Sequence, residues 1–180
     1  TTTMPSSDKT YAWNMTNAGK PGSTYTTIKG AISAIIAGDK GCAGICDEVG
    51  QTKMGKPYGL GTTPENQQSD PNYIESPFSH NSLHDFWHNI QSINNPWNGK
   101  FDLKNTSTTF AEFSFASYFK KYNPELGAKV QNAINKAQRA IKACPEPFVL
   151  NYDKTNPEVK AAIDACTELS NMLGQADEYI

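Results

Sequence analysis

Apolar residues recur along the chain at intervals of three and four, the spacing that places them on one face of an α-helix. The first run begins at Ile28 and continues to about Lys56, and its Gly-Asp-Lys-Gly stretch at 38–41 predicts a kink. A second stripe consists of Leu83, Phe86, Trp87, Ile90, Ile93 and Trp97. Two later stripes consist of Leu126, Val130, Ile134, Ala137, Ile141 and Cys144, and of Val159, Ile163, Cys166, Leu169 and Leu173. No run shows the sustained alternation of a half-buried strand.

Capping residues mark where the later helices begin. Ser79 can cap the second helix. Asn123 and Asn156 are each followed by proline and glutamate, which is the order of an N-cap, a proline at the first helical position and an acid in the first turn. A shorter aromatic helix is expected around residues 110–121. The sequence therefore predicts an all-α antiparallel bundle of four to five helices, with a long loop that starts after Pro57.

The length of 180 residues fits one domain, which we place at residues 25–180. Residues 1–24 are rich in Thr, Ser, Asn, Gly and Pro and are expected to be irregular. The chain starts without a charged and apolar leader, so we expect any targeting segment to have been removed or excluded. No stretch approaches the roughly 18 apolar residues that a membrane span needs, so none is predicted.

The formal net charge is -2, with fifteen lysines and one arginine that form no dense basic run. Binding to nucleic acid or to a membrane surface is therefore not expected. The four cysteines, Cys42, Cys46, Cys144 and Cys166, lack the spacing of a zinc ribbon or a redox pair and fall at apolar helical positions. They predict buried thiols. A disulfide in an oxidising compartment is the alternative.

The three histidines, His80, His84 and His88, follow one another at intervals of four. In a helix each step advances only about 40°, so the imidazoles would form one strip. The favoured interpretation is partly solvated helix surface. The alternative is that His84 and His88 grip a divalent metal as zincin histidines do, with Asp85 where a zincin has glutamate and with a third ligand from elsewhere.

The same helix carries a second polar strip opposite its apolar stripe. Its members are Asn81, Asp85, Ser92 and Asn95, with Asn89 at its edge. Lysine and glutamate are better helix formers than these residues on a face that only meets water. We therefore expect the strip to meet something polar, and Asp85 to be hydrogen-bonded to its neighbours.

Three stretches, residues 41–58, 75–95 and 115–148, resemble the second half of imelysin-like proteins. These are bacterial cell-envelope proteins classed as a family of insulin-cleaving metallopeptidases, and the resemblance covers roughly residues 25–180. It implies no catalytic residue in this chain, but it does imply a set of ligand-binding or cleft residues. That set consists of Asp47, Glu48, Lys53, Glu75, Ser79, Asn81, Asp85 and Asn89.

The resemblance also implies two helical bundles with a cleft between them, export to the periplasm or cell surface, often as a lipoprotein, and a link to iron or haem uptake. The family motif Gly-x-His-x-x-Glu belongs to the first bundle and is absent here, because no histidine has a glutamate three residues later. Peptidase activity and metal binding by that motif therefore do not carry over. Gly44 stands where the family tends to have an acid, and His84 and His88 lie outside its pattern.

Three functions follow as hypotheses. The first is an envelope binding module for iron or haem acquisition, whose polar face lines a cleft against an N-terminal imelysin-like bundle in the same or an associated chain. The second is part of a zinc metallopeptidase. The third is an interaction scaffold whose polar face only holds two bundles together. Iron, haem and zinc are the candidate ligands, and the chain alone is expected to lack proteolytic activity and tight zinc.

Overall fold

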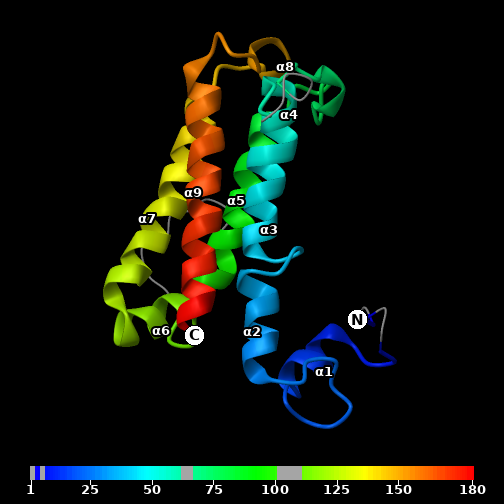
Figure 1. Cartoon of the computed structure of the whole chain (residues 1–180), viewed down its shortest axis with the longest axis vertical. Coiled ribbons are helices and arrows are strands. Elements are labelled where there is room, and N and C mark those ends of the chain that lie inside the picture. The colour runs from blue at the N-terminus through cyan, green and yellow to red at the C-terminus, as the bar shows by residue number, and fades with distance from the viewer. Residues whose placement is uncertain (1–2, 5–6, 62–66, 101–110) are drawn as a thin grey trace.

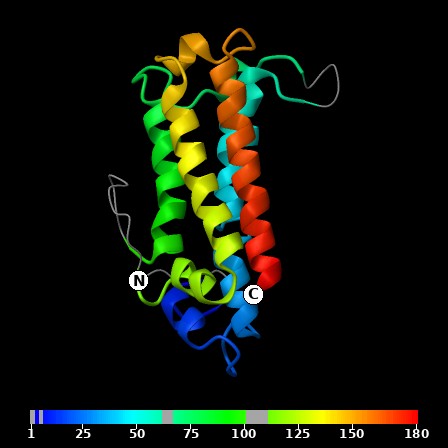
Figure 2. The same ribbon diagram turned by 90° about the vertical axis from the view of Figure 1, so that its left-hand side faces the viewer.

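Four helical rods run alternately up and down in the computed structural model of the chain (Figures 1 and 2). The structure describes residues 3–4, 7–61, 67–100 and 111–180. The first rod is continuous and consists of α3 (Cys42–Asp47), the π-helix η1 (Glu48–Met54) and α4 (Gly55–Tyr58). The other rods are α5 (Ser82–Asn98), α7 (Pro124–Ala143) and α9 (Pro157–Tyr179). Within these ranges no strand forms, so the predicted all-α antiparallel bundle is confirmed.

Shorter elements lie at or beyond the two ends of the bundle (Figure 1). They are α1 (Tyr11–Thr16), α2 (Ile28–Ile36), the 3-10 turn η2 (Pro71–Tyr73), α6 (Phe115–Tyr122) and α8 (Phe148–Asn151). Helix α1 lies in the segment that was expected to be irregular. That segment folds around buried Asn14, whose Nδ2 donates to the carbonyl of Thr10 at 3.0 Å and whose Oδ1 accepts from the amide of Thr24 at 2.8 Å.

The predicted apolar stripes form the core. Every residue of the α5 stripe and of the α9 stripe is buried, and in the α7 stripe only Leu126 is partly exposed. Helix α9 packs against α7, α3 and η1. The prediction of the first stripe was wrong at its start, because Ile28 is 66% exposed and the core begins only near Ile36.

The first predicted helix is broken, not kinked. Helix α2 ends at Ile36 and α3 begins at Cys42. A Cβ atom on Gly41 would lie 2.6 Å from the carbonyl oxygens of Ala34 and Ile35, so the chain turns where only glycine fits. At the other end the rod passes through Pro57, which was expected to stop it, and ends at Tyr58, where Gly59 with a φ of +79° is the C-cap.

The two helix starts predicted from the Asn-Pro-Glu motifs hold, with one difference in chemistry. Asn123 Oδ1 accepts from the amide of Leu126 at 3.1 Å, which confirms the cap of α7. Asn156 occupies the N-cap position of α9, but its side chain does not cap the helix. Its Nδ2 instead donates to Thr155 Oγ1 at 3.3 Å. The aromatic helix begins at Phe115, and Phe110 lies outside the described residues.

All four cysteines are buried and free, which confirms the prediction of buried thiols. Burial raises the pKa of Cys42 to about 11 and that of Cys166 to about 12. Thiols with such a pKa stay protonated at neutral pH and are poor nucleophiles and poor metal ligands. No described helix is both long enough and apolar enough to cross a membrane.

Candidate functional site

The candidate site is built around the loop that leads into α5. Two of its residues have left-handed backbone, Ser76 with φ +54° and His80 with φ +57°. Because a left-handed residue cannot continue into an α-helix, α5 starts only at Ser82, with Asn81 at the N-cap position. The prediction that Ser79 caps this helix was therefore wrong. Its hydroxyl donates to the carbonyl of Ser76 at 3.4 Å.

The late start of α5 also corrects the histidine prediction. His80 lies in the loop, so only His84 and His88 share a helical face. The strip of three imidazoles does not form.

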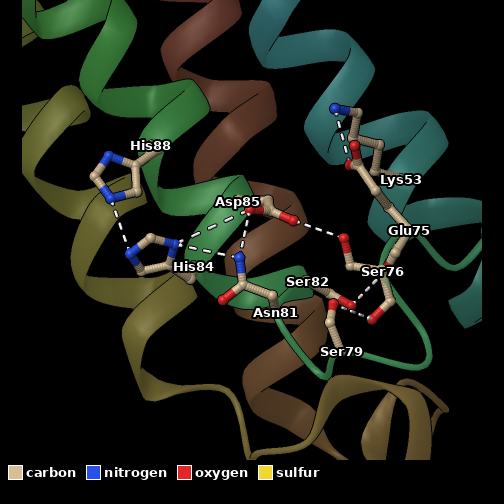
Figure 3. Close-up of polar contacts among 9 residues, drawn as sticks. All are labelled: Lys53, Glu75, Ser76, Ser79, Asn81, Ser82, His84, Asp85 and His88. Atoms are coloured by element: carbon tan, nitrogen blue, oxygen red, sulfur yellow. Dashed lines mark hydrogen bonds and ion pairs between the residues drawn. The ribbon is translucent and has the colours of Figure 1, made fainter.

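Asp85 is held by two side chains, one from the loop and one from the N-cap position (Figure 3). Ser76 Oγ donates to its Oδ2 at 2.8 Å, and Asn81 Nδ2 donates to its Oδ1 at 2.8 Å. The Asp85 side chain keeps 33% of its surface exposed. The prediction that Asp85 is tied to its neighbours is confirmed, and Ser76 is a partner that the sequence-derived site set did not include.

Lys53 reaches the same loop from η1. Its Nζ lies 3.0 Å from Glu75 Oε2 and 3.6 Å from Glu48 Oε1, with the lysine side chain only 19% exposed. In an α-helix, residues five apart point about 140° away from one another. A π-helix bonds residue i to i+5, so it brings Glu48 and Lys53 to one face. The π-turn thus aims Lys53 at Glu75.

The structure therefore joins four of the eight predicted site residues through one loop. We call Lys53, Glu75, Ser76, Asn81 and Asp85 the polar cluster (Figure 3).

The remaining predicted site residues lie outside this cluster, and two of them contact it. Glu48 joins it through Lys53, and Ser79 through the carbonyl of Ser76. Asp47 is exposed on α3, and Asn89 is half-buried on α5. The carbonyl of Asn89 accepts from Ser92 Oγ at 2.7 Å.

The two helical histidines meet each other beside the polar cluster. His88 Nε2 lies 3.0 Å from His84 Nε2, and His84 Nδ1 lies 4.0 Å from Asp85 Oδ1. A catalytic zinc site needs three protein ligands and an open position for water. In the part of the chain that the structure describes, no three His, Cys, Asp or Glu side chains converge in this way. The described residues by themselves therefore offer no three-ligand site for a catalytic zinc ion.

Comparison with known proteins gives two similar solved structures. A protein from Parabacteroides distasonis, described as an iron-regulated protein A precursor, is 29% identical, with a TM-score of 0.83 over 98% of this chain and 49% of its own. An imelysin peptidase from Bacteroides ovatus is 33% identical, with a TM-score of 0.78 over 96% of this chain and 46% of its own. This chain therefore spans about half the length of each. A comparison with curated proteins gives no match.

The family model of imelysin matches residues 3–176, and thus also includes most of the N-terminal segment. Both solved structures agree with it in fold. The chain belongs to the imelysin family.

Proposed function

We propose that this chain is the binding module of an imelysin-type protein of the bacterial cell envelope and serves the acquisition of iron or haem. Its polar cluster lines a cleft against a second, N-terminal bundle in the same or an associated chain. Membership of the family supports the proposal, as does the likeness to a protein described as iron-regulated. The share of the solved structures that the chain leaves uncovered, about half, gives room for the second bundle.

The fixed carboxylate of Asp85 is the observation that carries this proposal. An ionised carboxylate can accept about four hydrogen bonds, and Ser76 and Asn81 supply two of them. The remaining lone pairs lie on a group that is one third exposed and already oriented, so binding needs little reordering of this side chain. Lys53 adds a cation whose position is set by Glu75 at 3.0 Å.

The location and the domain division are part of the same proposal. We place the protein in the periplasm or at the cell surface, as the family resemblance implies. We keep residues 25–180 as the bundle and residues 1–24 as a separate N-terminal segment. The buried Asn14, which accepts from the amide of Thr24 within the same segment, supports this division.

The test is a titration of the chain with hemin and with ferric citrate, alone and mixed with its proposed N-terminal partner. Asp85→Asn removes the charge but keeps the shape, and the matched control is Asp164→Asn on the exposed face of α9, where Asp164 pairs with Lys160. We expect saturable binding that Asp85→Asn weakens about tenfold or more, while the control stays within about twofold. Absence of saturable binding in both arrangements, or an equal effect of the control, would overturn the proposal.

The metallopeptidase is the second candidate, because the family is one of peptidases and the Bacteroides ovatus neighbour is described as one. The missing Gly-x-His-x-x-Glu motif speaks against it for this chain. A peptide-cleavage assay with and without a chelator separates the two candidates. Cleavage by this chain that the chelator abolishes would establish the enzyme.

The interaction scaffold makes a different prediction for the same variants. If the polar cluster only holds two bundles together, Asp85→Asn weakens the association of the chain with its partner and neither iron nor haem binds. Analytical ultracentrifugation of the mixed proteins measures that association directly.

A further inference from the structure

His84 and His88 form a pair at the edge of the polar cluster, which His84 contacts through Asn81 and Asp85. They lie one helical turn apart on α5, and their Nε2 atoms face each other at 3.0 Å (Figure 3). Two bare lone pairs at this distance would repel, so either one nitrogen carries a hydrogen or both share a bound ion. The His84 side chain is 64% exposed, which leaves the pair open to a solute.

We propose that the two Nε2 atoms form a binding site for a divalent late transition-metal ion, with Cu²⁺ as the preferred ion. Neutral imidazole is a good ligand for Cu²⁺, Ni²⁺ and Zn²⁺, and nitrogen sites bind Cu²⁺ most tightly among these ions. The site is distinct from the family's missing histidine motif. It does not depend on the function proposed above.

The distance between the two Nε2 atoms determines which coordination geometry of the metal ion they favour. With metal–nitrogen bonds of about 2.0–2.1 Å, a separation of 3.0 Å gives an angle of about 94° at the metal. That angle suits neighbouring positions of a tetragonal Cu²⁺ or Ni²⁺ ion. A tetrahedral Zn²⁺ ion would need the nitrogens about 3.3 Å apart.

The orientation of the rings agrees with a shared ion. The ring centroids are 4.3 Å apart with an interplanar angle of 64°, so the imidazoles do not meet head-on along the line between the nitrogens. On the other edge of the His84 ring, Nδ1 lies 3.5 Å from Asn81 Nδ2 and 4.0 Å from Asp85 Oδ1. When Nε2 binds the ion, the ring hydrogen must lie on Nδ1, where the negative charge of Asp85 at 4.0 Å favours it through space, and the Asn81 amide group can then no longer donate to Nδ1. Asp85 is thus a positioning residue for this site.

The remaining coordination positions belong to water or to a ligand from outside the chain, because the described residues bring no third donor of this kind to the pair. Two imidazoles alone make a site of moderate affinity. The indole of Trp87 lies against His88, with ring centroids 4.8 Å apart, and Lys142 Nζ lies 4.6 Å from the centre of that indole. A paramagnetic ion at His88 will therefore quench Trp87 fluorescence.

The experiment is a titration of the whole chain with Cu²⁺, followed by tryptophan fluorescence and by electron paramagnetic resonance. His84→Ala and His88→Gln each remove one ligand, and His80→Ala is the matched control because His80 lies in the loop. We expect one Cu²⁺ per chain with nitrogen coupling in the spectrum, about tenfold weaker binding in each ligand variant, and a change within about twofold in the control. Asp85→Asn is expected to weaken binding by a smaller factor.

Circular dichroism shows whether each variant keeps its fold, and the exposure of His84 makes His84→Ala the safer of the two. Binding that is unchanged in His84→Ala, or reduced equally in His80→Ala, would overturn the proposal. Tighter binding of Zn²⁺ than of Cu²⁺ would overturn the preferred geometry.

Discussion

Helix α5 carries two polar groups that differ in what covers them. At its start, Asp85 bonds to a loop and keeps a third of its surface open to water. Farther along, Gln91 and Asn94 are 1% and 4% exposed and face α7, where Gln138 is 3% exposed. The first group contains charges, and the second consists only of neutral amides.

The second group, which we call the amide ladder, consists of Gln91, Asn94, Asn98, Gln131 and Gln138. Gln138 Nε2 donates to Gln91 Oε1 at 2.8 Å, and Gln131 Nε2 donates to Asn94 Oδ1 at 3.2 Å. Asn98 Nδ2 donates to Gln131 Oε1 at 3.1 Å. Each amide offers both donors and acceptors, so the bonds can be met inside the bundle without burying a charge.

The comparison of these two groups shows that the extent to which a polar residue is buried decides its role more than its residue type does. The amide ladder lies between two helices, with Gln91, Asn94 and Gln138 buried and the other two amides partly exposed. Its paired bonds fit only one register of α5 against α7. The polar cluster packs against the protein on one side and is open to water on the other, so its charged groups remain accessible to a ligand or a partner. The predictions below test this division.

Gln138→Ala is expected to have the largest effect. The change removes a hydrogen bond to Gln91 at a site that is 3% exposed, so we expect a loss of about 2–3 kcal/mol in the free energy of unfolding. Urea denaturation measures it, with Gln175→Ala on the exposed face of α9 as the control. A loss below about 0.5 kcal/mol would show that the amide ladder does not hold α5 against α7.

Asp85→Ala is expected to cost less, about 1–2 kcal/mol, because water can reach the groups that it leaves behind. Its partners Ser76 and Asn81 lie at the rim and not between helices. Thermal unfolding of the Asp85→Ala and Gln138→Ala variants measures which of the two substitutions causes the greater loss of stability. An unchanged melting temperature, or a greater loss than for Gln138→Ala, would reverse the comparison.

The helices and their buried faces could be predicted because they depend on a periodic signal. Trp87, Ile134 and Leu169 are buried where the stripes placed them. The two Asn-Pro-Glu motifs correctly marked the starts of α7 and α9 because proline fixes its own φ near the helical value.

The site could be predicted only in part, because its geometry depends on backbone that leaves no periodic trace. No residue pattern predicts the π-turn that brings Lys53 to Glu75. Gly50 and Gly55 are five residues apart, which is the spacing of a π-helical hydrogen bond, but this spacing alone does not indicate a π-turn. The left-handed φ of Ser76 opposes the usual preference of a residue before proline for extended backbone. Gln91 was overlooked because an amide is typical of a helix surface until its buried partner is known.

Ser76 offers a test in which two effects oppose each other. Ser76→Ala loses the hydrogen bond to Asp85 and keeps a side chain at φ +54°, so we expect a loss of about 1 kcal/mol. Ser76→Gly loses the same bond but relieves the left-handed strain, and its net effect should be smaller. Urea denaturation of both variants gives the order. If Ser76→Gly is the less stable variant, the lost hydroxyl and the backbone strain do not govern the stability of this loop.

Glu48→Gln is expected to have the smallest effect. Glu48 Oε1 lies 3.6 Å from Lys53 Nζ with 60% of the side chain exposed, whereas Glu75 Oε2 lies at 3.0 Å with 42% exposed. Exposed ion pairs contribute little, so we expect less than about 0.5 kcal/mol for Glu48→Gln and about 0.5–1 kcal/mol for Glu75→Gln.

Thermal unfolding of both glutamate variants in dilute buffer and in about 0.5 M NaCl measures how much more stability Glu75→Gln loses than Glu48→Gln. The salt should reduce this difference because it screens the ion pairs with Lys53. If Glu48→Gln costs more than Glu75→Gln, Lys53 is held by its own π-turn and not by the loop. The polar cluster would then consist of two independent parts, and only the part around Asp85 would depend on the left-handed backbone at Ser76.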